Sequence, residues 1–155
     1  MSEMKRIKSS NLFPLISEIL DNGQSTKISV SGNSMYPFLR DGIDSVELTK
    51  GNFEQLSRGD IVMIQRSDGS YVMHRILKKN KDHFYMIGDA QQWIEGPLYP
   101  NQLVARVTAI WRKEKRISCS SCCLRFLAGL WLYLRPFRYF FIWEYRKLRK
   151  LLRLY

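Results

Sequence analysis

The sequence predicts a mainly β protein with a short N-terminal helix and a basic amphipathic helical tail at the C-terminus. Short apolar runs separated by turn residues fill the middle of the chain, a pattern typical of β-strands. The C-terminal part instead repeats aromatic and basic residues at helical spacing. With 155 residues and 45% hydrophobic content, the chain is long enough to form one core. We therefore divide it into an N-terminal helical segment (1–24), a β domain (25–111) and a tail (112–155).

Formal charge separates the β domain from the tail. Residues 1–111 contain 13 Lys and Arg against 12 Asp and Glu, whereas residues 112–155 contain 12 against 2. The net charges are therefore +1 and +10, so nearly all the basicity of the chain lies in the tail. We expect an anionic partner at the tail rather than at the β domain.

Residues 11–21 are expected to form the N-terminal helix, ending before Gly23. Its apolar face consists of Leu12, Leu15, Ile16 and Ile19. The residues before it are polar, so we expect no signal peptide or leading membrane helix there.

The β domain is expected to contain at least five strands. They are residues 26–30, 59–65, 71–77, 84–87 and 103–111. Asp68-Gly69 supplies the turn of a hairpin between the second and third of these strands.

A serine directly after the first expected strand is the candidate nucleophile. Ser34 lies in a turn that begins at Gly32 and leaves through Pro37, whose ring fixes its own φ and restricts Tyr36. A serine hydroxyl is a poor nucleophile until a nearby base removes its proton, and His74 is a suitable base. Gly, Asn and Ser are also ordinary turn residues, so this string alone leaves both interpretations open.

Five sequence blocks within residues 28–107 distinguish this serine from an ordinary turn residue. They are Gly32-Asn33-Ser34-Met35-Tyr36-Pro37, Asp41-Gly42, Arg58-Gly59-Asp60-Ile61-Val62, His74-Arg75-Ile76 and Ile87-Gly88-Asp89. In their content and order, the chain resembles type I signal peptidases and their relatives, the self-cleaving SOS-type repressors. The resemblance implies a curled, mainly antiparallel β peptidase domain, with the serine and its base on neighbouring elements of one cleft. We expect no cofactor.

The resemblance implies that Ser34 is the nucleophile and His74 the general base. Bacterial housekeeping members carry lysine at the base position, whereas members of the endoplasmic-reticulum type carry histidine, as this chain does. Histidine has an ordinary pKa of about 6.5, so it needs less burial than lysine to act as a base near neutral pH. It does need an acceptor on its other ring nitrogen, and we assign this orienting role to Asp89. The alternative for Asp89 is a turn residue that bonds its own backbone.

The oxyanion and substrate contacts are expected from Gly32, Asn33 and Met35, next to the nucleophile. Many signal peptidases carry serine or threonine two residues before the nucleophile, and Gly32 departs from that pattern. The expected oxyanion donors are therefore backbone amides, including that of Ser34, with the Asn33 side chain as a further donor.

Other candidate bases fit the pattern less well. His83 lies in a polar connection, where we expect a solvated loop residue. Lys78 and Lys79 are fallback bases, and strand alternation places only Lys78 on the face of His74. Arg75 faces away from His74 by the same rule, as a structural ion-pair partner.

Three cysteines cluster near the start of the tail. Cys119, Cys122 and Cys123 offer three ligands, whereas zinc normally takes four and no fourth candidate has suitable spacing. We expect no metal site and regard the cysteines as small packing residues. Lipidation is left open.

The tail is expected to bind an anionic membrane surface, because aromatic rings favour headgroup depth and long cationic side chains reach outward. The expected membrane-binding residues are Trp131, Arg135, Arg138, Trp143, Arg146, Lys147, Arg149, Lys150 and Arg153. Nucleic acid is the competing anionic partner, but the apolar surface of the tail exceeds what phosphate binding requires. Residues 117–134 could span the membrane, form a hairpin or lie at its interface, and Pro136 is expected to separate them from the last helix.

These observations lead us to expect a membrane-associated serine endopeptidase that removes signal or leader peptides from precursor proteins through an acyl-enzyme. One alternative is a specialised peptidase that processes a small modified or secreted peptide. Another is a catalytically silent membrane-binding or regulatory module. A repressor fits less well, since no helix-turn-helix precedes the β domain. The side of the membrane and any partner protein stay open.

Overall fold

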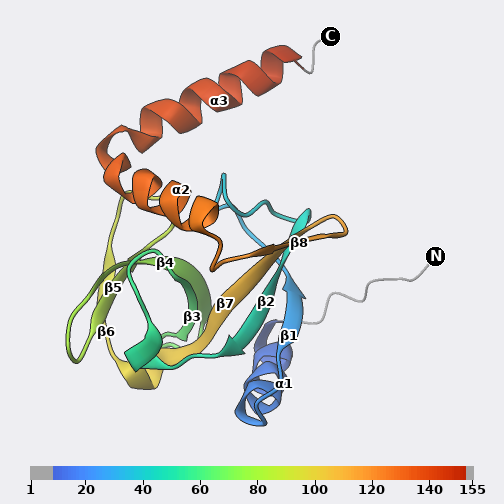
Figure 1. Ribbon diagram of the computed structural model, residues 1–155, viewed down its shortest axis with the longest axis vertical. Helices are drawn as coiled ribbons and strands as arrows, with labels where there is room; N and C mark the ends of the chain where they lie inside the picture. The colour runs from blue at the N-terminus through green and yellow to red at the C-terminus, as the bar shows by residue number, and fades with distance from the viewer. Residues whose placement is uncertain (1–8, 153–155) are drawn as a thin grey trace.

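The structure is a computed structural model that describes residues 9–152, with the side chains of residues 12–145, 147 and 148. An antiparallel sheet curls on itself, with one helix beside its N-terminal strands and two helices across its other end (Figure 1). The predicted fold class, mainly antiparallel β with a short N-terminal helix and a helical C-terminal tail, is confirmed.

The sheet has eight strands, all paired antiparallel. They are β1 Thr26–Ser29, β2 Asp44–Lys50, β3 Ile61–Gln65, β4 Tyr71–Lys79, β5 Phe84–Ile87, β6 Glu95–Leu98, β7 Leu103–Arg112 and β8 Lys115–Ser118. The strand order is β1-β2-β7-β3-β4-β5-β6, and β8 pairs with the end of β7. On one edge β7 pairs with β2 along most of its length, and on the other edge it pairs with β3 near its start and with β8 at its end. It therefore joins β1 and β2 to the curled wing formed by β3 to β6.

Three helices and three short 3-10 turns complete the fold. They are α1 Ser9–Asp21, α2 Cys122–Tyr133 and α3 Arg138–Leu152, with η1 Phe53–Gln55, η2 Pro100–Gln102 and η3 Arg135–Phe137. Pro136 lies in η3, so it separates the two C-terminal helices as expected. We call residues 131–138 the elbow.

Two apolar cores hold the sheet. The first packs Ile16 and Leu20 of α1 against β2 and β7, and it includes Met35 and Leu39 from the turn after β1. The second fills the curled wing of β3 to β6, around Phe84. The first core therefore fixes the turn that carries Ser34, because two side chains of that turn belong to it.

The sheet contains strands that the sequence analysis does not predict, namely β2, β6 and β8. Because β8 ends at Ser118, the sheet extends beyond the expected domain boundary at residue 111. Residues 117–134 form the end of β8, a turn and the 12-residue helix α2. Among the described residues, no helix is long and apolar enough to cross a membrane.

Candidate active site

Ser34 and His74 line one cleft of about 290 Å³. Ser34 comes from the turn after β1 and His74 from β4, while Gln91 and Trp93 of the β5–β6 connection form another wall. The two elements that the sequence singles out are therefore brought together by the fold.

The turn that carries Ser34 is tied down at several points. Val30 donates to the Asp44 carbonyl at 2.9 Å, and the Gly32 amide donates to Asp41 Oδ1 at 3.1 Å. Gly32 has a φ of +90°, a left-handed conformation that favours glycine. The Ser34 carbonyl accepts a bond from the Ala90 amide at 2.8 Å, which fixes the turn against the β5–β6 connection.

A buried carboxylate secures the far end of this turn. Asp44 accepts hydrogen bonds from Arg40 and Arg112, and Arg112 also donates to the Phe38 carbonyl at 3.0 Å. Burial by itself raises the pKa of Asp44, but the hydrogen bonds from the two guanidinium groups outweigh it and hold the pKa below its ordinary value. The turn is thus held by the ion pairs of Asp44 as well as by apolar packing.

Free backbone amides lie next to the Ser34 hydroxyl. Within the described part of the chain, the amides of Asn33, Ser34 and Met35 donate no hydrogen bond, so an oxyanion has donors at the expected place. The Gly32 amide is already bound to Asp41, so it is not a free oxyanion donor, but Gly32 lines the cleft. The Met35 side chain is buried in the first core, where it anchors the turn.

His74 is buried on β4, opposite Val62 of β3. Burial lowers the pKa of its imidazole below the ordinary value, and the Arg66 cation acts in the same direction against the opposing effect of Glu95. The ring is therefore neutral near pH 7 and can accept a proton. The described Ser34 and His74 side chains share the cleft without a hydrogen bond between them. Hydrogen bonds between a nucleophile and its base are often long before substrate binds and shorten in the substrate complex.

Asp89 does not face the imidazole, contrary to expectation. Both of its oxygens accept bonds from Arg75, with Nε to Oδ1 at 2.8 Å and Nη2 to Oδ2 at 2.7 Å. Arg75 also donates to the Gly59 carbonyl and lies over the Phe38 ring, 4.7 Å from its centroid. A buried guanidinium requires a partner, and its two parallel donors match a carboxylate. The acid that His74 meets is Glu95, whose Oε2 lies 3.5 Å from Nδ1.

The Arg75–Asp89 pair instead braces the connection that holds the nucleophile turn. Arg75 has the ion-pair role that the sequence analysis expects. One residue before Asp89, a Cβ added to Gly88 would lie 2.7 Å from the Ser34 carbonyl oxygen. Only glycine allows this close approach. The Ile87-Gly88-Asp89 block therefore packs against the backbone of Ser34 and does not contact His74 through Asp89.

The fallback bases lie away from the cleft. A register shift between Ile76 and Lys78 interrupts strand alternation, which removes the reason to place Lys78 beside His74. Lys79 donates to the carbonyls of Glu54 and Leu56, at 3.1 and 3.2 Å. His83 lies in the β4–β5 turn, beside Asp82 and Asn80.

The elbow reaches the same β5–β6 connection from the tail. Trp131 Nε1 donates to the Asp89 carbonyl at 3.0 Å, and Arg138 Nη1 donates to the Gly88 carbonyl at 3.3 Å. Arg138 is only 1% exposed and also donates to the Trp131 carbonyl. These two residues are therefore structural contacts, not the membrane-facing groups that the sequence analysis expects. Interior carbonyl groups need donors, and the elbow supplies them.

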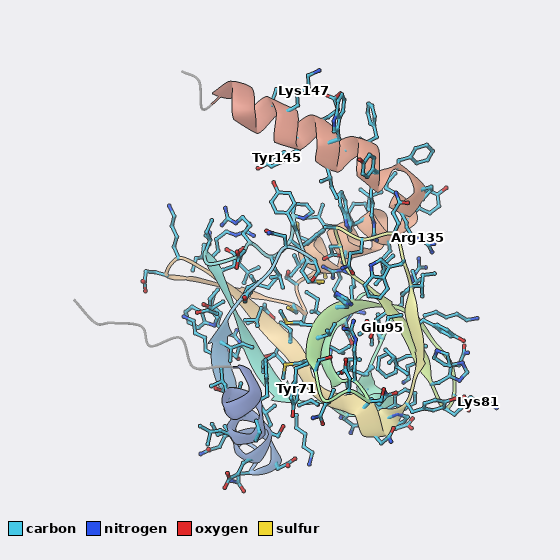
Figure 2. All side chains as sticks on the ribbon, turned by 180° about the vertical axis from the view of Figure 1, so that it is seen from behind. Tyr71, Lys81, Glu95, Arg135, Tyr145 and Lys147 are labelled. Atoms are coloured by element: carbon cyan, nitrogen blue, oxygen red, sulfur yellow. The ribbon has the colours of Figure 1, made fainter. Side chains whose placement is uncertain are left out.

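The tail exposes many apolar side chains, although Ala128, Leu132 and Ile142 are buried. Lys147 projects away from the β domain and lies over the Trp143 ring, whereas Tyr145 points back toward the β domain (Figure 2). Arg135 is half-buried. The side chains of Arg146, Arg149 and Lys150, and all of Arg153, lie outside the described residues. Exposed apolar and aromatic residues of the tail are Phe126, Leu127, Leu130, Tyr133, Phe137, Tyr139, Phe140, Phe141, Trp143, Tyr145 and Leu148.

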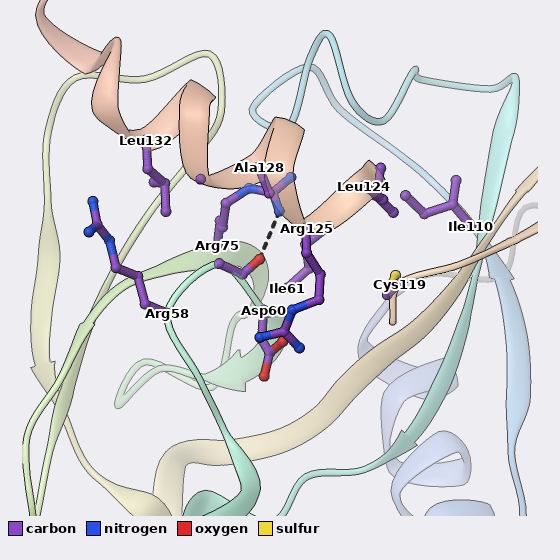
Figure 3. A pocket seen from close by; sticks show the side chains of 12 residues that line it. Arg58, Asp60, Ile61, Arg75, Ile110, Cys119, Leu124, Arg125, Ala128 and Leu132 are labelled. Atoms are coloured by element: carbon purple, nitrogen blue, oxygen red, sulfur yellow. Dashed lines mark hydrogen bonds between the residues drawn. The ribbon is translucent and has the colours of Figure 1, made fainter. Parts of the chain in front are cut away.

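A second cavity, of about 140 Å³, lies between α2 and the sheet (Figure 3). Cys119 lines it, and burial raises the pKa of this thiol to about 11, so it is a neutral packing residue as expected. Cys122 and Cys123 are exposed, which corrects their expected packing role. Among the described residues, no cluster of His, Cys, Asp and Glu is suited to hold a metal ion.

Comparison with known proteins gives no match, either to a family model or to a curated protein sequence.

Proposed function

We propose that the protein is a serine endopeptidase of the signal-peptidase type, with Ser34 as nucleophile and His74 as general base. The observation that carries the proposal is the cleft that Ser34 shares with a buried histidine of lowered pKa. The unbonded amides of Ser34 and Met35 add to it, because acyl transfer needs donors beside the nucleophile.

In the proposed mechanism, His74 removes the proton from Ser34 Oγ as this oxygen attacks the peptide carbonyl carbon. The carbonyl oxygen becomes an oxyanion and accepts hydrogen bonds from the free amides of the turn. His74 then passes its proton to the leaving amine, and the C–N bond breaks to leave an acyl ester on Ser34. A water molecule deprotonated by His74 hydrolyses that ester and restores the hydroxyl.

The proposed substrate class is a signal or leader peptide within a precursor protein, which the five sequence blocks favour. A small modified or secreted peptide is the second candidate, since the same chemistry would serve it. The third candidate is a silent module without cleavage.

The peptidase proposal is tested by incubating the full chain with a proteome-derived peptide library and mapping new termini by mass spectrometry. We expect Ser34→Ala to reduce cleavage by at least about 10³-fold, because nucleophile and base act as a unit. Ser29→Ala is the matched control, since Ser29 is exposed on β1 and does not line the cleft, and it should cleave like the unaltered chain. Cleavage that persists in Ser34→Ala, or a folded unaltered chain that cleaves nothing, would contradict the proposal.

We further propose that the tail holds the enzyme on an anionic membrane surface. Two features support this: the tail carries a net charge of +10, and its helices expose aromatic rings such as Tyr133 and Tyr139, 79% and 71% exposed. Rings at headgroup depth and cations near anionic lipid both favour binding, by about 1 kcal/mol for each basic residue.

Vesicle flotation tests this second proposal. The full chain should float with vesicles of mixed phosphatidylglycerol and phosphatidylcholine, less so as salt is raised, and weakly with phosphatidylcholine alone. Competition by a single-stranded oligonucleotide distinguishes the alternative partner. Tighter binding to the oligonucleotide than to the anionic vesicles would overturn the membrane assignment.

A further inference from the structure

The Nδ1 atom of His74 is a buried nitrogen without a hydrogen-bond partner among the described residues. Buried polar atoms nearly always have a partner, so this nitrogen calls for an explanation. Its neighbour is Glu95 Oε2 at 3.5 Å. That distance is a few tenths of an ångström beyond the range of about 2.7–3.2 Å for an N–H···O bond.

Glu95 is itself held in place from the other side. Arg66, directly after β3, donates from Nε to Oε1 and from Nη2 to Oε2, the latter at 2.8 Å. Glu95 lies at the start of β6, and its side chain is only 14% exposed. The carboxylate is thus fixed between a guanidinium and the imidazole, and both of these neighbours, Arg66 and His74, line the cleft.

We propose that Glu95 is the positioning residue of His74, and that Arg66 limits how strongly Glu95 acts on the ring. The inference rests on the proposed peptidase function. With the Nδ1 proton directed to Glu95, Nε2 is the nitrogen that accepts the Ser34 proton and later returns it to the leaving amine. The same carboxylate stabilises the imidazolium that forms between these two steps.

A purely structural ion pair makes a different prediction. If Arg66 and Glu95 only closed the curled wing, removing either partner would weaken folding and shift the His74 pKa through the lost charge, in opposite directions for the two variants, but the folded enzyme would keep its kcat. If Glu95 positions the base, its loss also leaves the Nδ1 proton without a fixed acceptor. Only the positioning role therefore predicts that Glu95→Gln lowers the kcat of the folded enzyme with little change in KM.

The experiment measures the His74 pKa by NMR in the full chain, together with the pH dependence of kcat/KM. His83→Gln identifies the signals of His74, since the chain has two histidines. Glu95→Gln should lower the pKa of His74 and move the acidic limb of kcat/KM to lower pH, because the base stays neutral further into acid. It should also reduce kcat by about 10²–10⁴-fold with little change in KM. Arg66→Gln should shift both the pKa and the limb upward.

Glu18→Gln is the matched control, because Glu18 is exposed on α1 and is not among the residues that line the cleft. An unchanged kcat in Glu95→Gln would overturn the positioning role, and so would shifts of the His74 pKa of the same sign in the two variants. Should Glu95→Gln fold poorly, Glu95→Asp still decides, because it keeps the charge but withdraws the carboxylate from Nδ1, and only the positioning role predicts a lower kcat in that variant. Ser34→Ala separates the two proposals: unchanged cleavage there removes the peptidase, while the NMR titration still tests the contact between Glu95 and His74.

Discussion

The β domain and the tail place their apolar side chains in opposite ways. In the sheet, Val46, Leu48 and Ile64 are fully buried, and acidic residues nearly balance the basic ones. In the tail, Phe126 is 70% exposed, and basic residues greatly outnumber acidic ones. The first region buries its apolar side chains in two cores, whereas the second leaves an apolar surface of the kind that marks an interface. The difference agrees with our two proposals, in which the β domain performs the chemistry and the tail binds a membrane surface.

A polar seam joins these two regions. It consists of the bonds from Trp131 and Arg138 of the elbow to the carbonyls of Asp89 and Gly88. On the other side of the seam, Ala90 holds the Ser34 carbonyl. The tail is therefore not an independent appendage, because Trp131 and Arg138 contact the connection that holds Ser34.

The largest effect is expected inside the β domain. Asp89→Asn leaves the buried Arg75 cation without its charged partner, and we expect the free energy of unfolding to fall by about 3–5 kcal/mol. Urea denaturation measures this loss. Asp21→Asn is the control, because the Asp21–Lys50 pair is exposed and should contribute no more than about 1 kcal/mol. Equal losses in the two variants would show that burial does not set the strength of this pair.

A smaller effect is expected at the seam. Trp131→Phe keeps an aromatic ring but removes the donor to the Asp89 carbonyl, so the free energy of unfolding should fall by about 1–3 kcal/mol. Hydrogen exchange should quicken in α2. Trp143→Phe, at a ring that is 50% exposed, should change stability by less than about 0.5 kcal/mol. If Trp143→Phe destabilised the protein as much as Trp131→Phe, the hydrogen bond from Trp131 would not be what stabilises the seam.

The pH dependence of stability reports on the β domain, because His74 is buried there. Burial lowers the pKa of His74 in the folded state, so the unfolded chain binds a proton first as the pH falls. Stability should therefore decrease below the ordinary histidine pKa of about 6.5, until the folded-state pKa is passed. Chemical denaturation at a series of pH values from about 7.5 to 4.5 measures this slope. Histidine titrates in this range, whereas few carboxylates do. His74→Gln should flatten it, and an unchanged slope in that variant would assign the effect to other groups.

The smallest effect on folding is expected on the outer face of the tail. Phe140→Ser removes a ring that is 59% exposed, so the free energy of unfolding should stay within about 0.5 kcal/mol. Binding to anionic vesicles should weaken by about tenfold, because burying a phenyl side chain contributes roughly 1.5–3 kcal/mol. A marked loss of stability would instead mean that this face packs within the protein.

The sequence predicts the fold well where a pattern is local. The hairpin of β3 and β4 follows from two apolar runs around Asp68-Gly69, and β5 begins and ends as predicted. The alternating Val46 and Leu48 of β2 carry a signal that the sequence analysis overlooks. The β6 strand has no such signal, because Gly96 and Pro97 argue against a strand.

The site is predictable only in part, for the same reason. Ser34 and His74 belong to sequence blocks, but the position of Glu95 beside His74 depends on how β4, β5 and β6 pair. Helical spacing likewise cannot show that Arg138 faces inward, because the elbow sets its direction. Contacts made by long-range pairing and by chain reversal leave little trace in local patterns.

The seam has a practical consequence for anyone who wishes to simplify the protein for crystallisation or high-yield expression. Truncating the chain after Ser118 would remove α2 and α3, with their exposed apolar and basic side chains, and make the remainder easier to handle in detergent-free buffer. The same cut would strip an indole and a guanidinium from the backbone that supports Ser34, so the truncated enzyme should lose turnover even on a freely dissolved peptide.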